Sequence, residues 1–340
     1  MPTHRHALVV GKFAPLHHGH QLLLDRATEL AERVTVVVWS NPDFVEMSNE
    51  VRAAWIRELY PNAQVIVGDD GPPNDAPGPE HWVYIAQLLA LQNLAPDVVV
   101  SSEAYGVPFA DHLGAAHVEV DGDRSLFSIS GTDIRADVHA HCHHLDPRVY
   151  QHFVGRVVFL GAESTGKSAL AERMAAEFET EFVAEYGRQH YEERGGELDL
   201  EDYVTIARRH RELEDDAALR ANRYLFVDTN AITTMFFSHY YNRESLPPLR
   251  AMADECRDRY RYVFVCDDDI PFEQDGWRDN ETWRARMQGM VLHDLAVRGI
   301  EFHVVRGSLD ERVEQVKAVL AGDDVGNASR RRYSSGPKRS

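Results

Sequence analysis

Apolar, strand-like runs alternate with helical patterns along this chain in two successive series. The first series has its runs at 7–10, 34–39, 63–67, 97–101 and 116–120, and the second at 156–160, 181–184, 224–227, 262–266 and 302–305. Such alternation is typical of parallel sheets with helices on both faces. A chain of 340 residues is also too long for one typical core. We therefore predict an α/β protein with two doubly wound parallel-sheet domains, over 1–150 and 151–321.

Composition narrows the class of protein. No apolar stretch approaches the roughly 20 residues of a membrane-spanning helix, and the few residues before the first strand do not form a signal peptide. We therefore expect a cytoplasmic protein with no membrane insertion. The three cysteines lack zinc-finger spacing. A formal net charge of −19 opposes non-specific attraction to nucleic acid, so no nucleic-acid partner is expected and anionic substrates must be held by local donors.

Two segments have an unusual composition. Residues 322–340 are rich in Gly, Ser and Asp and carry basic residues near their end. We favour a disordered tail over a functional basic arm for this segment. Residues 139–144 hold four histidines and one cysteine. A polar helix end or an interdomain loop is favoured there over a metal site, so we assign no metal to it.

A glycine-containing turn follows the first strand, at residues 11–20. Its sequence, GKFAPLHHGH, precedes a helical pattern, so backbone N–H groups and the positive helix end would face a ligand. Gly19 allows close approach of the backbone. His17 and His20 are spaced so that both can donate hydrogen bonds to one phosphoryl group as negative charge builds. The turn indicates a phosphate site, with a helix-capping histidine as the alternative explanation of this motif alone.

A second element near the end of the same domain favours the phosphate site. Ser130 and Thr132 belong to the residue types that cap helices, and Arg135 lies one turn into the next helical pattern. Hydroxyl groups and an arginine at a helix start suit a triphosphate. We therefore expect these three residues to bind the triphosphate of a nucleotide.

The second domain opens on a phosphate-binding loop. Residues 161–168, GAESTGKS, match the P-loop pattern GxxxxGK[ST] directly after a strand and before a helical run. Gly161 and Gly166 let backbone N–H groups wrap phosphates, and Lys167 adds a point charge. The Ser168 hydroxyl is placed to ligate Mg²⁺. This is the strongest single motif in the chain.

Acidic residues close two later strands of the second domain. Asp228 follows the strand at 224–227, and we expect it beside Mg²⁺ with Ser168. A strand-ending helix cap is the alternative. Glu185 follows the strand at 181–184, where it would hold a ribose hydroxyl or act as a base. A structural Glu185–Arg188 ion pair explains the same spacing almost as well.

Arginines follow a glycine-containing loop beyond the strand at 262–266. Arg278, Arg284 and Arg286 are placed as in a lid that closes on ATP and offsets negative charge during transfer. Charges on a solvated helix face are the alternative. We expect Arg278 and Arg284 to contact the nucleotide.

The blocks at 11–20, 101–106, 120–124 and 129–135 together resemble the nicotinamide mononucleotide adenylyltransferase domain of NadR-type proteins, within the HxGH nucleotidyltransferase superfamily. The resemblance covers most of residues 7–136 and implies a Rossmann-like domain. It implies that His17 and His20 bind ATP phosphates and that Lys12 helps to neutralise them. It also implies nucleotide contacts from Gly11, Phe13 and Gly19.

The resemblance further implies recognition of a nicotinamide ring. Such a ring is flat and cationic, so aromatic side chains and backbone groups would hold it. Among the aromatic candidates we favour Trp55 and Tyr105. The other candidates are Trp39, Phe44 and Trp82.

The blocks at 161–168, 185–188, 228–234 and 271–278 are similar to the ribosylnicotinamide kinase domain of the same proteins. Lys167, Asp228 and Glu185 would act in phosphoryl transfer, with Ser168 and Asp228 at Mg²⁺. The remaining nucleotide- and substrate-binding residues that the resemblance implies are Gly161, Glu163, Ser164, Thr165, Gly166, Tyr186, Arg188, Arg278 and Arg284.

The joint resemblance implies an enzyme of NAD salvage. The second domain would phosphorylate nicotinamide riboside with ATP, and the first would adenylylate nicotinamide mononucleotide with ATP to give NAD and pyrophosphate. Mg²⁺ is the implied cofactor. A homo-oligomer and a functional link to a riboside importer are compatible with the resemblance.

Two alternatives stay open from the sequence. The HxGH motif alone does not select the acceptor, so an adenylyltransferase–kinase fusion could act on another cofactor precursor. The alternative from another class is an NAD-responsive transcriptional regulator, because some NadR-type proteins carry an N-terminal helix-turn-helix module. Only about six residues precede the first strand here, and the acidic composition does not favour DNA, so we expect no such module.

Overall fold

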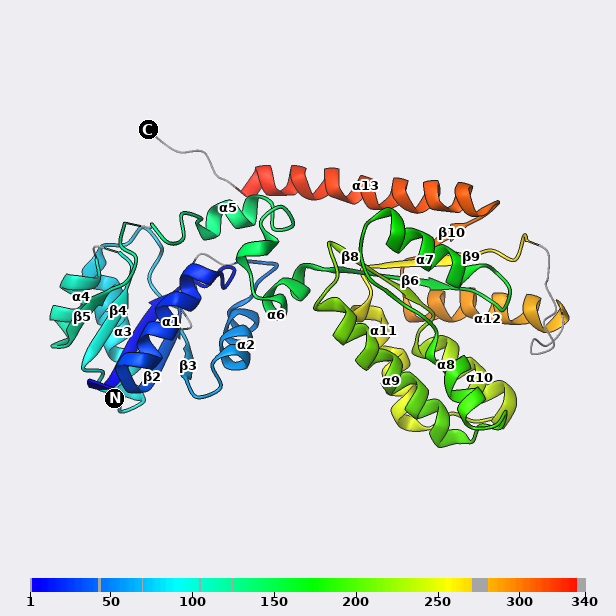
Figure 1. The fold of residues 1–340 in the computed structure, drawn as a ribbon, viewed down its shortest axis with the longest axis horizontal. Coiled ribbons are helices and arrows are strands. Elements are labelled where there is room, and N and C mark those ends of the chain that lie inside the picture. Colours follow the sequence, from blue (N-terminus) through cyan, green and yellow to red (C-terminus); the bar gives the residue numbers. More distant parts are fainter. Residues whose placement is uncertain are drawn as a thin grey trace. The chain divides into compact units, whose positions relative to one another are not determined.

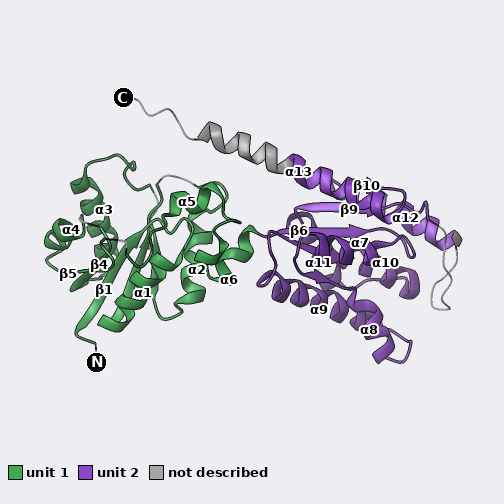
Figure 2. Ribbon diagram, turned by 45° about the horizontal axis from the view of Figure 1, so that its top comes forward, with its two compact units in different colours: residues 1–153 green, residues 154–340 purple. Residues whose placement is uncertain are grey.

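The computed structural model describes residues 2–41, 44–68, 70–103, 105–123, 125–270 and 281–334. The chain divides into two compact units, Met1–Phe153 and Val154–Ser340, coloured separately in Figure 2. Each unit contains one five-stranded parallel sheet with helices around it. The predicted α/β class, with two parallel-sheet domains, is therefore confirmed.

The amino-terminal unit has the strand order β3-β2-β1-β4-β5, with β1 at the centre. Its strands are β1 (His4–Gly11), β2 (Ala31–Val38), β3 (Gln64–Val67), β4 (Val98–Ser101) and β5 (Ala116–Glu119). Its helices are α1 (His18–Leu30), α2 (Asn49–Leu59), α3 (Gly78–Leu91), α4 (Gly106–Leu113), α5 (Gly131–Ala136) and α6 (Pro147–Tyr150), with 3-10 turns η1 (Cys142–His144) and η2 (Gln151–Phe153).

Successive side chains of each strand point to opposite faces of this sheet, and different helices cover the two faces. Leu8, Val37 and Val99 are buried in one core cluster with residues of α3 and α4. Helix α1 instead packs beside β1 and β2 through its buried Leu23 and Leu24 (Figure 1). Because the chain reverses its direction of winding at β1, the carboxyl ends of β1 and β4 border the crevice where ligands bind in open α/β sheets.

The carboxy-terminal unit has the strand order β10-β9-β6-β8-β7. Its strands are β6 (Gly155–Leu160), β7 (Phe182–Val183), β8 (Tyr224–Asp228), β9 (Tyr262–Cys266) and β10 (His303–Val305). Its helices are α7 (Lys167–Glu177), α8 (Tyr186–Glu193), α9 (Leu200–Ala218), α10 (Ala231–Asn242), α11 (Pro247–Arg259), α12 (Glu281–Arg298) and α13 (Leu309–Ser334).

The core of this unit lies between the central strands and two helices. Phe159, Phe226 and Phe264 are fully buried on neighbouring strands and stack at centroid distances of 5.7–6.1 Å. The same cluster includes buried residues of α7 and α13, which lie together on one face of the sheet in Figure 1. This packing holds the central strand β6 in place, so the loop that follows β6 begins at a firmly packed strand.

Helix α13 runs to Ser334, past residue 322, where the composition indicated the start of a disordered tail. None of the helices in the described part of the chain is both long enough and apolar enough to span a bilayer.

Candidate active sites

The turn predicted to bind phosphate in the amino-terminal unit leads into the first residues of α1. His17 is the N-cap, and its Nδ1 accepts a hydrogen bond from Gly19 N at 3.1 Å. The backbone N–H of His17 donates in turn to His20 Nδ1 at 3.4 Å, and the two rings stack with centroids 3.8 Å apart. Because each Nδ1 acts as an acceptor, the neutral rings carry their proton on Nε2. His17 thus caps the helix, and both rings keep a donor on the nitrogen opposite the cap.

A cavity of about 270 Å³ collects the residues expected at the triphosphate. Lys12, His17, His20, Ser130, Thr132 and Arg135 all line it. Burial is the main reason that the pKa of Lys12 is lowered, and Arg135 adds to the effect. Burial likewise lowers the pKa of Arg135. An anion entering the cavity would offset this cost of holding two cations in a partly buried place.

The residues Ser130, Thr132 and Arg135, predicted to bind the triphosphate, make different contacts in the structure. Ser130 is the N-cap of α5, where its Oγ accepts from Asp133 N at 3.2 Å and donates to Asp133 Oδ2 at 2.6 Å. Arg135 donates to the carbonyl of Ala14 and to Thr132 Oγ1, the latter at 2.9 Å. Ser130 therefore first serves to begin the helix, whereas Arg135 joins that helix to the turn after β1.

Sequence reasoning missed two residues that shape this site. Arg52 is fully buried and donates to the carbonyls of Lys12 and Trp39, the latter at 3.0 Å. Asp121 accepts from Leu126 N at 2.9 Å and from Phe127 N, bonds that hold the pKa of its carboxyl low. An arginine in an amphipathic helix is typically a surface residue, so no sequence signal marked Arg52, whereas Asp121 lies in the block at 120–124 that carries the resemblance but was given no role.

A second cavity of about 490 Å³ adjoins the first, since Lys12 and His20 line both. Of the predicted residues, Gly11, Phe13 and Tyr105 also line it. The aromatic candidates that line it are Trp39 and Trp82, and Trp39 lies 4.9 Å from the ring of His81.

The structure places Trp55, predicted at the nicotinamide ring, away from both cavities of this unit. Trp55 is 5% exposed and packs against His152 and Phe153, with ring centroids 5.4 and 5.9 Å away. It lines neither cavity of the unit in the described structure. The helix face that carries Trp55 is buried by η2, so Trp55 is a core residue.

The P-loop of the carboxy-terminal unit joins β6 to α7. Gly161 has a φ of +135°, and a Cβ there would lie 2.6 Å from the carbonyl oxygen of Cys266. Gly166, with a φ of +79°, begins α7. The Lys167 ammonium donates to the carbonyl of Ala162 at 2.8 Å. The loop thus has the backbone geometry that sequence alone attributed to its glycines.

Three long side chains support the P-loop through hydrogen bonds to its backbone. Gln288 accepts from Ala162 N at 2.9 Å and donates to Cys266 O at 3.0 Å. Arg312 donates to Thr165 O at 2.5 Å. Arg284 is 4% exposed and donates to Ser164 O at 3.3 Å.

Arg284 is therefore not the lid residue that the sequence suggested. Its guanidinium also donates to Ile270 O at 2.8 Å and to Asp268 O at 3.2 Å, so it ties the loop after β9 to the P-loop. In this structure the guanidinium is directed at backbone carbonyls and is not exposed as a lid arginine would be. Arg278, predicted beside it, lies outside the described residues.

The expected magnesium side chains meet at the end of β8. Ser168 Oγ donates to Asp228 Oδ2 at 2.5 Å, and Asp228 is 1% exposed. Within the described part of the chain, Asp228 Oδ1 is buried and has no hydrogen-bond partner. A hydroxyl and a carboxylate with an unpaired oxygen fit Mg²⁺, which proteins commonly hold through one or two carboxylates together with substrate phosphates.

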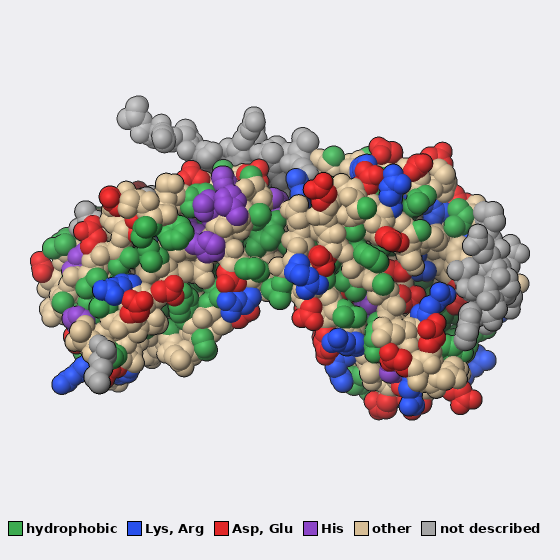
Figure 3. All heavy atoms as spheres, viewed as in Figure 1, with side chains coloured by type: hydrophobic (Ala, Val, Ile, Leu, Met, Phe, Trp, Pro, Cys, Tyr) green, Lys and Arg blue, Asp and Glu red, His purple; other side chains and the backbone are tan. Residues whose placement is uncertain are grey.

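The histidine-rich segment before the unit boundary forms a cluster. The rings of His143 and His144 lie 4.1 Å apart, and His141 lies 6.3–6.4 Å from both. Figure 3 shows histidine side chains gathered on one face of this unit. Burial, followed by the neighbouring histidines, lowers the pKa of His144. No group of three or more metal-ligating side chains in the described residues is arranged to hold an ion.

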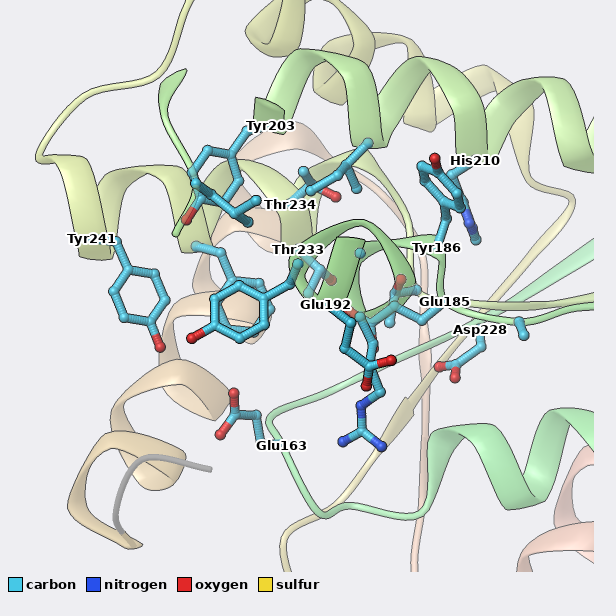
Figure 4. A pocket seen from close by; sticks show the side chains of 18 of the residues that line it. Glu163, Glu185, Tyr186, Glu192, Tyr203, His210, Asp228, Thr233, Thr234 and Tyr241 are labelled. Carbon is cyan, nitrogen blue, oxygen red and sulfur yellow. The ribbon is translucent and has the colours of Figure 1, made fainter. Parts of the chain in front are cut away.

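A cavity of about 790 Å³ opens beside the P-loop (Figure 4). The predicted residues Glu163, Ser164, Lys167, Ser168, Glu185, Tyr186, Arg188 and Asp228 all line it. Burial and the nearby Asp228 carboxylate raise the pKa of Glu185 to about 7, against the opposing effects of Lys167 and Arg188. A carboxylate poised near neutral pH beside a phosphate loop suits proton transfer. Thr165 is fully buried behind the loop and donates to Ala162 O at 2.8 Å.

The far side of this cavity was not predicted. Figure 4 shows Tyr203 and Tyr241 on the side away from Asp228. Tyr191 and Phe237 also line the cavity, as do the acidic residues Glu192 and Glu197. Helices α8, α9 and α10 bring these residues together over long sequence separations, so no local motif marks them.

Comparisons with known proteins agree with this architecture. Residues 8–137 match the cytidylyltransferase-like family, and residues 156–312 match an AAA domain family. The chain is 30% identical to the trifunctional NAD biosynthesis/regulator protein NadR of Escherichia coli K12, over 87% of this chain and 77% of that protein. The protein of the same name from Salmonella typhimurium is 29% identical, over 92% of this chain and 83% of its own length.

Solved structures show the same fold. A NadR protein in complex with NAD and AMP-PNP superposes with a TM-score of 0.68, at 22% identity, over 94% of this chain and 96% of that one. A NadR protein in complex with NR gives a TM-score of 0.67 at 23% identity, over 93% and 95%. With the identity and coverage of the curated relatives, the chain belongs to the NadR family of NAD biosynthesis proteins.

Proposed function

We propose that the carboxy-terminal unit phosphorylates nicotinamide riboside with ATP. We propose further that the amino-terminal unit joins the resulting mononucleotide to the adenylyl group of a second ATP, which yields NAD and pyrophosphate. The family supports this assignment, and so does the pairing of a P-loop site with an HxGH site in one chain. We propose that both reactions take place in the cytoplasm.

The observation that carries the assignment is the chemistry of the large cavity beside the P-loop. Its aromatic side chains offer flat faces, and its carboxylates offer negative charge. A nicotinamide riboside carries a flat, cationic ring, which aromatic faces and carboxylates attract. The aromatic residues are Tyr186, Tyr191, Tyr203, Phe237 and Tyr241, and the acidic residues beyond Glu185 and Asp228 are Glu163, Glu192 and Glu197.

Phosphoryl transfer in this unit needs positioning and charge neutralisation more than covalent help from the protein. The loop backbone and Lys167 would hold the ATP phosphates. Ser168 and Asp228 would hold Mg²⁺, which neutralises phosphate charge when bound. Glu185 lines the same cavity, and with a pKa raised to about 7 by burial it can accept the proton of the acceptor hydroxyl.

Adenylyl transfer in the other unit rests on donors that meet the developing charge. The proton-bearing Nε2 atoms of His17 and His20 would donate to phosphate oxygens, while Lys12 and Arg135 supply positive charge. The attacking group is the phosphate of the mononucleotide itself, so no protein nucleophile is needed. The adjoining cavity with Trp39 and Trp82 would take the nicotinamide end.

The test is a substrate panel with the purified full chain and magnesium-ATP. Nicotinamide riboside should give the mononucleotide with ADP, and then NAD with pyrophosphate. The mononucleotide alone should give NAD and pyrophosphate without ADP. Riboflavin phosphate and phosphopantetheine in place of the mononucleotide test for another cofactor precursor. Adenylylation of either of these, with both nicotinamide compounds left intact, would overturn the assignment.

A further inference from the structure

Two polar side chains in the cavity beside the P-loop are not used by the chemistry described above. His210 comes from α9 and Thr233 from α10, and both line the cavity. In Figure 4, His210 lies on the same side as Asp228. Thr233 lies between Asp228 and the pair Tyr203 and Tyr241. Helices from two separate stretches of sequence therefore direct hydrogen-bonding groups into the same space.

Both groups are buried and lack partners. His210 is 4% exposed and Thr233 is 2% exposed. Among the described residues, neither ring nitrogen of His210 nor the hydroxyl of Thr233 has a hydrogen-bond partner. A buried polar group without a partner is costly, and native structures rarely keep one unless a ligand or water satisfies it. Two such groups on one cavity wall indicate a ligand with hydroxyls or amides at that place.

The neighbouring carboxylate does not satisfy His210. His210 Nε2 lies 3.7 Å from Glu214 Oε1, beyond hydrogen-bond distance. Glu214 already accepts from Arg259 Nε at 2.8 Å and from the Tyr260 hydroxyl at 2.7 Å. Burial lowers the pKa of His210, against the raising effects of Glu214, Asp228 and a weak contact with the Thr229 backbone that lies outside ordinary hydrogen-bond geometry. The imidazole is therefore neutral at pH 7, with one donor and one acceptor.

The order of groups along the cavity identifies the part of the acceptor that lies here. The reacting hydroxyl must lie near Lys167 and Asp228, where the phosphate is transferred. The aromatic ring of a riboside fits the wall with Tyr203 and Tyr241. The sugar connects the two, so its remaining hydroxyls pass between these ends. Thr233 lies between these two ends, and His210 lies at the end with Asp228, so both border the space that the sugar would occupy.

We propose that His210 and Thr233 bind the secondary hydroxyls of the acceptor's ribose and thereby select ribonucleosides over deoxyribonucleosides. This inference rests on the proposed kinase function of the carboxy-terminal unit. The chemistry matches, because each sugar hydroxyl can donate one hydrogen bond and accept another. An acceptor that lacks a hydroxyl would leave the imidazole of His210 or the hydroxyl of Thr233 unpaired.

The test compares kcat/KM for nicotinamide riboside with that for its 2′-deoxy and 3′-deoxy analogues. The parent chain should prefer the riboside over at least one analogue by about tenfold or more. Thr233→Val keeps the shape of the side chain, and His210→Leu removes both ring nitrogens. Each variant should lower that preference about tenfold by reducing kcat/KM for the riboside while leaving the value for the deoxy analogue unchanged. Thr205→Val, on the exposed side of α9, is the matched control and should keep the parental preference.

The outcomes separate this inference from the function on which it rests. A parent chain that leaves the riboside unphosphorylated would refute the proposed function. A parent that phosphorylates riboside and both deoxy analogues equally would refute the inference alone. If the two groups are only a packing defect, His210→Leu and Thr233→Val will raise Tm and leave the preference unchanged, which also overturns the inference. Should His210→Leu fail to fold, shown by a lost thermal transition, the isosteric Thr233→Val decides.

Discussion

The two proposed phosphate sites lie at the same place in the folds of the two units but are built from different parts of the chain. In each, the site follows the central strand of a parallel sheet and precedes a helix. In the amino-terminal unit, side chains line the phosphate cavity, chiefly His17, His20 and Arg135. In the carboxy-terminal unit, the loop backbone forms the cradle, with a φ of +135° at Gly161. One arrangement depends on side-chain identity and the other on backbone conformation.

This difference sets what each site tolerates. A backbone cradle fails when a side chain forces the loop out of shape, whatever its chemistry. A side-chain site fails when a donor is lost, even though the fold is kept. Single substitutions can separate these two kinds of failure.

The largest effect is expected from Gly161→Ala. The added Cβ would meet the Cys266 carbonyl at 2.6 Å, and the positive φ strains any L-residue. Riboside phosphorylation should fall about 10³-fold, and the free energy of unfolding of this unit should fall by about 1–3 kcal/mol. Steady-state kinetics and chemical denaturation measure the two effects. Gly289→Ala is the matched control, because a Cβ there meets nothing within 4 Å, and activity should be unaffected.

His20→Ala should lower adenylylation of the mononucleotide by about 10²-fold, since one donor to the transition state is lost. Thermal stability should fall only slightly, because His20 contributes one long hydrogen bond of 3.4 Å to the capping of α1, whereas His17 is the N-cap itself. His18→Ala, at the neighbouring position that lines neither described cavity of this unit, should keep full activity. Equal losses in His18→Ala and His20→Ala would mean that the turn acts through its fold and not through a donor.

The pH dependence of phosphorylation tests Glu185. A carboxyl with a pKa of about 7 is mostly protonated at pH 6 and mostly ionised at pH 8, so kcat/KM should rise about tenfold over this range if Glu185 accepts the proton. Glu185→Gln should be slow and flat across the same range. A parental profile that persists in Glu185→Gln would assign the titration to another group.

The same shift has a consequence for stability. The folded pKa of Glu185 is raised above its ordinary value of 4.5 by burial, so its contribution to stability is complete below that value. The contribution is lost as the pH rises through about 7. The stability difference between Glu185→Gln and the parent should therefore increase in favour of the glutamine variant from pH 4.5 to pH 8, as followed by Tm.

The smallest effect is expected from Ser130→Ala. Ser130 caps α5 through its bonds with Asp133, so its loss should cost about 1 kcal/mol of stability. Adenylylation should stay within a factor of about three if the hydroxyl serves chiefly as a cap. Ser130→Thr preserves the hydroxyl and should restore stability. A loss of activity much larger than this in Ser130→Ala, at unchanged Tm, would instead place the hydroxyl on the nucleotide.

The local sequence was enough to predict those features that the local backbone conformation determines. The strand–turn–helix spacing at 11–20 and 161–168 determines where the helices begin and which residues line the cavities, and both turns have the expected form. Asp228 was identified for the same reason, because it ends an apolar strand next to the P-loop. These features need no knowledge of distant contacts.

Contacts between residues far apart in the sequence determine the features that the sequence did not predict. Trp55 is covered by η2, about a hundred residues later, so its helix face could not be assigned from α2 alone. Arg284 resembles a solvated or lid arginine until the loop after β9 buries it against backbone carbonyls. Arg52 and His210 likewise gain their roles only from the elements that pack around them.

The central claim is that one chain holds two independent sites that act in sequence. Lys167→Ala and His20→Ala each disable one site, and the most direct measurement follows nicotinamide riboside, its mononucleotide and NAD in each variant and in a mixture of the two. We predict that Lys167→Ala makes NAD only from the mononucleotide, that His20→Ala accumulates the mononucleotide, and that the mixture makes NAD from the riboside. NAD formation from the riboside by Lys167→Ala alone, or no accumulation of mononucleotide in His20→Ala, would contradict the account.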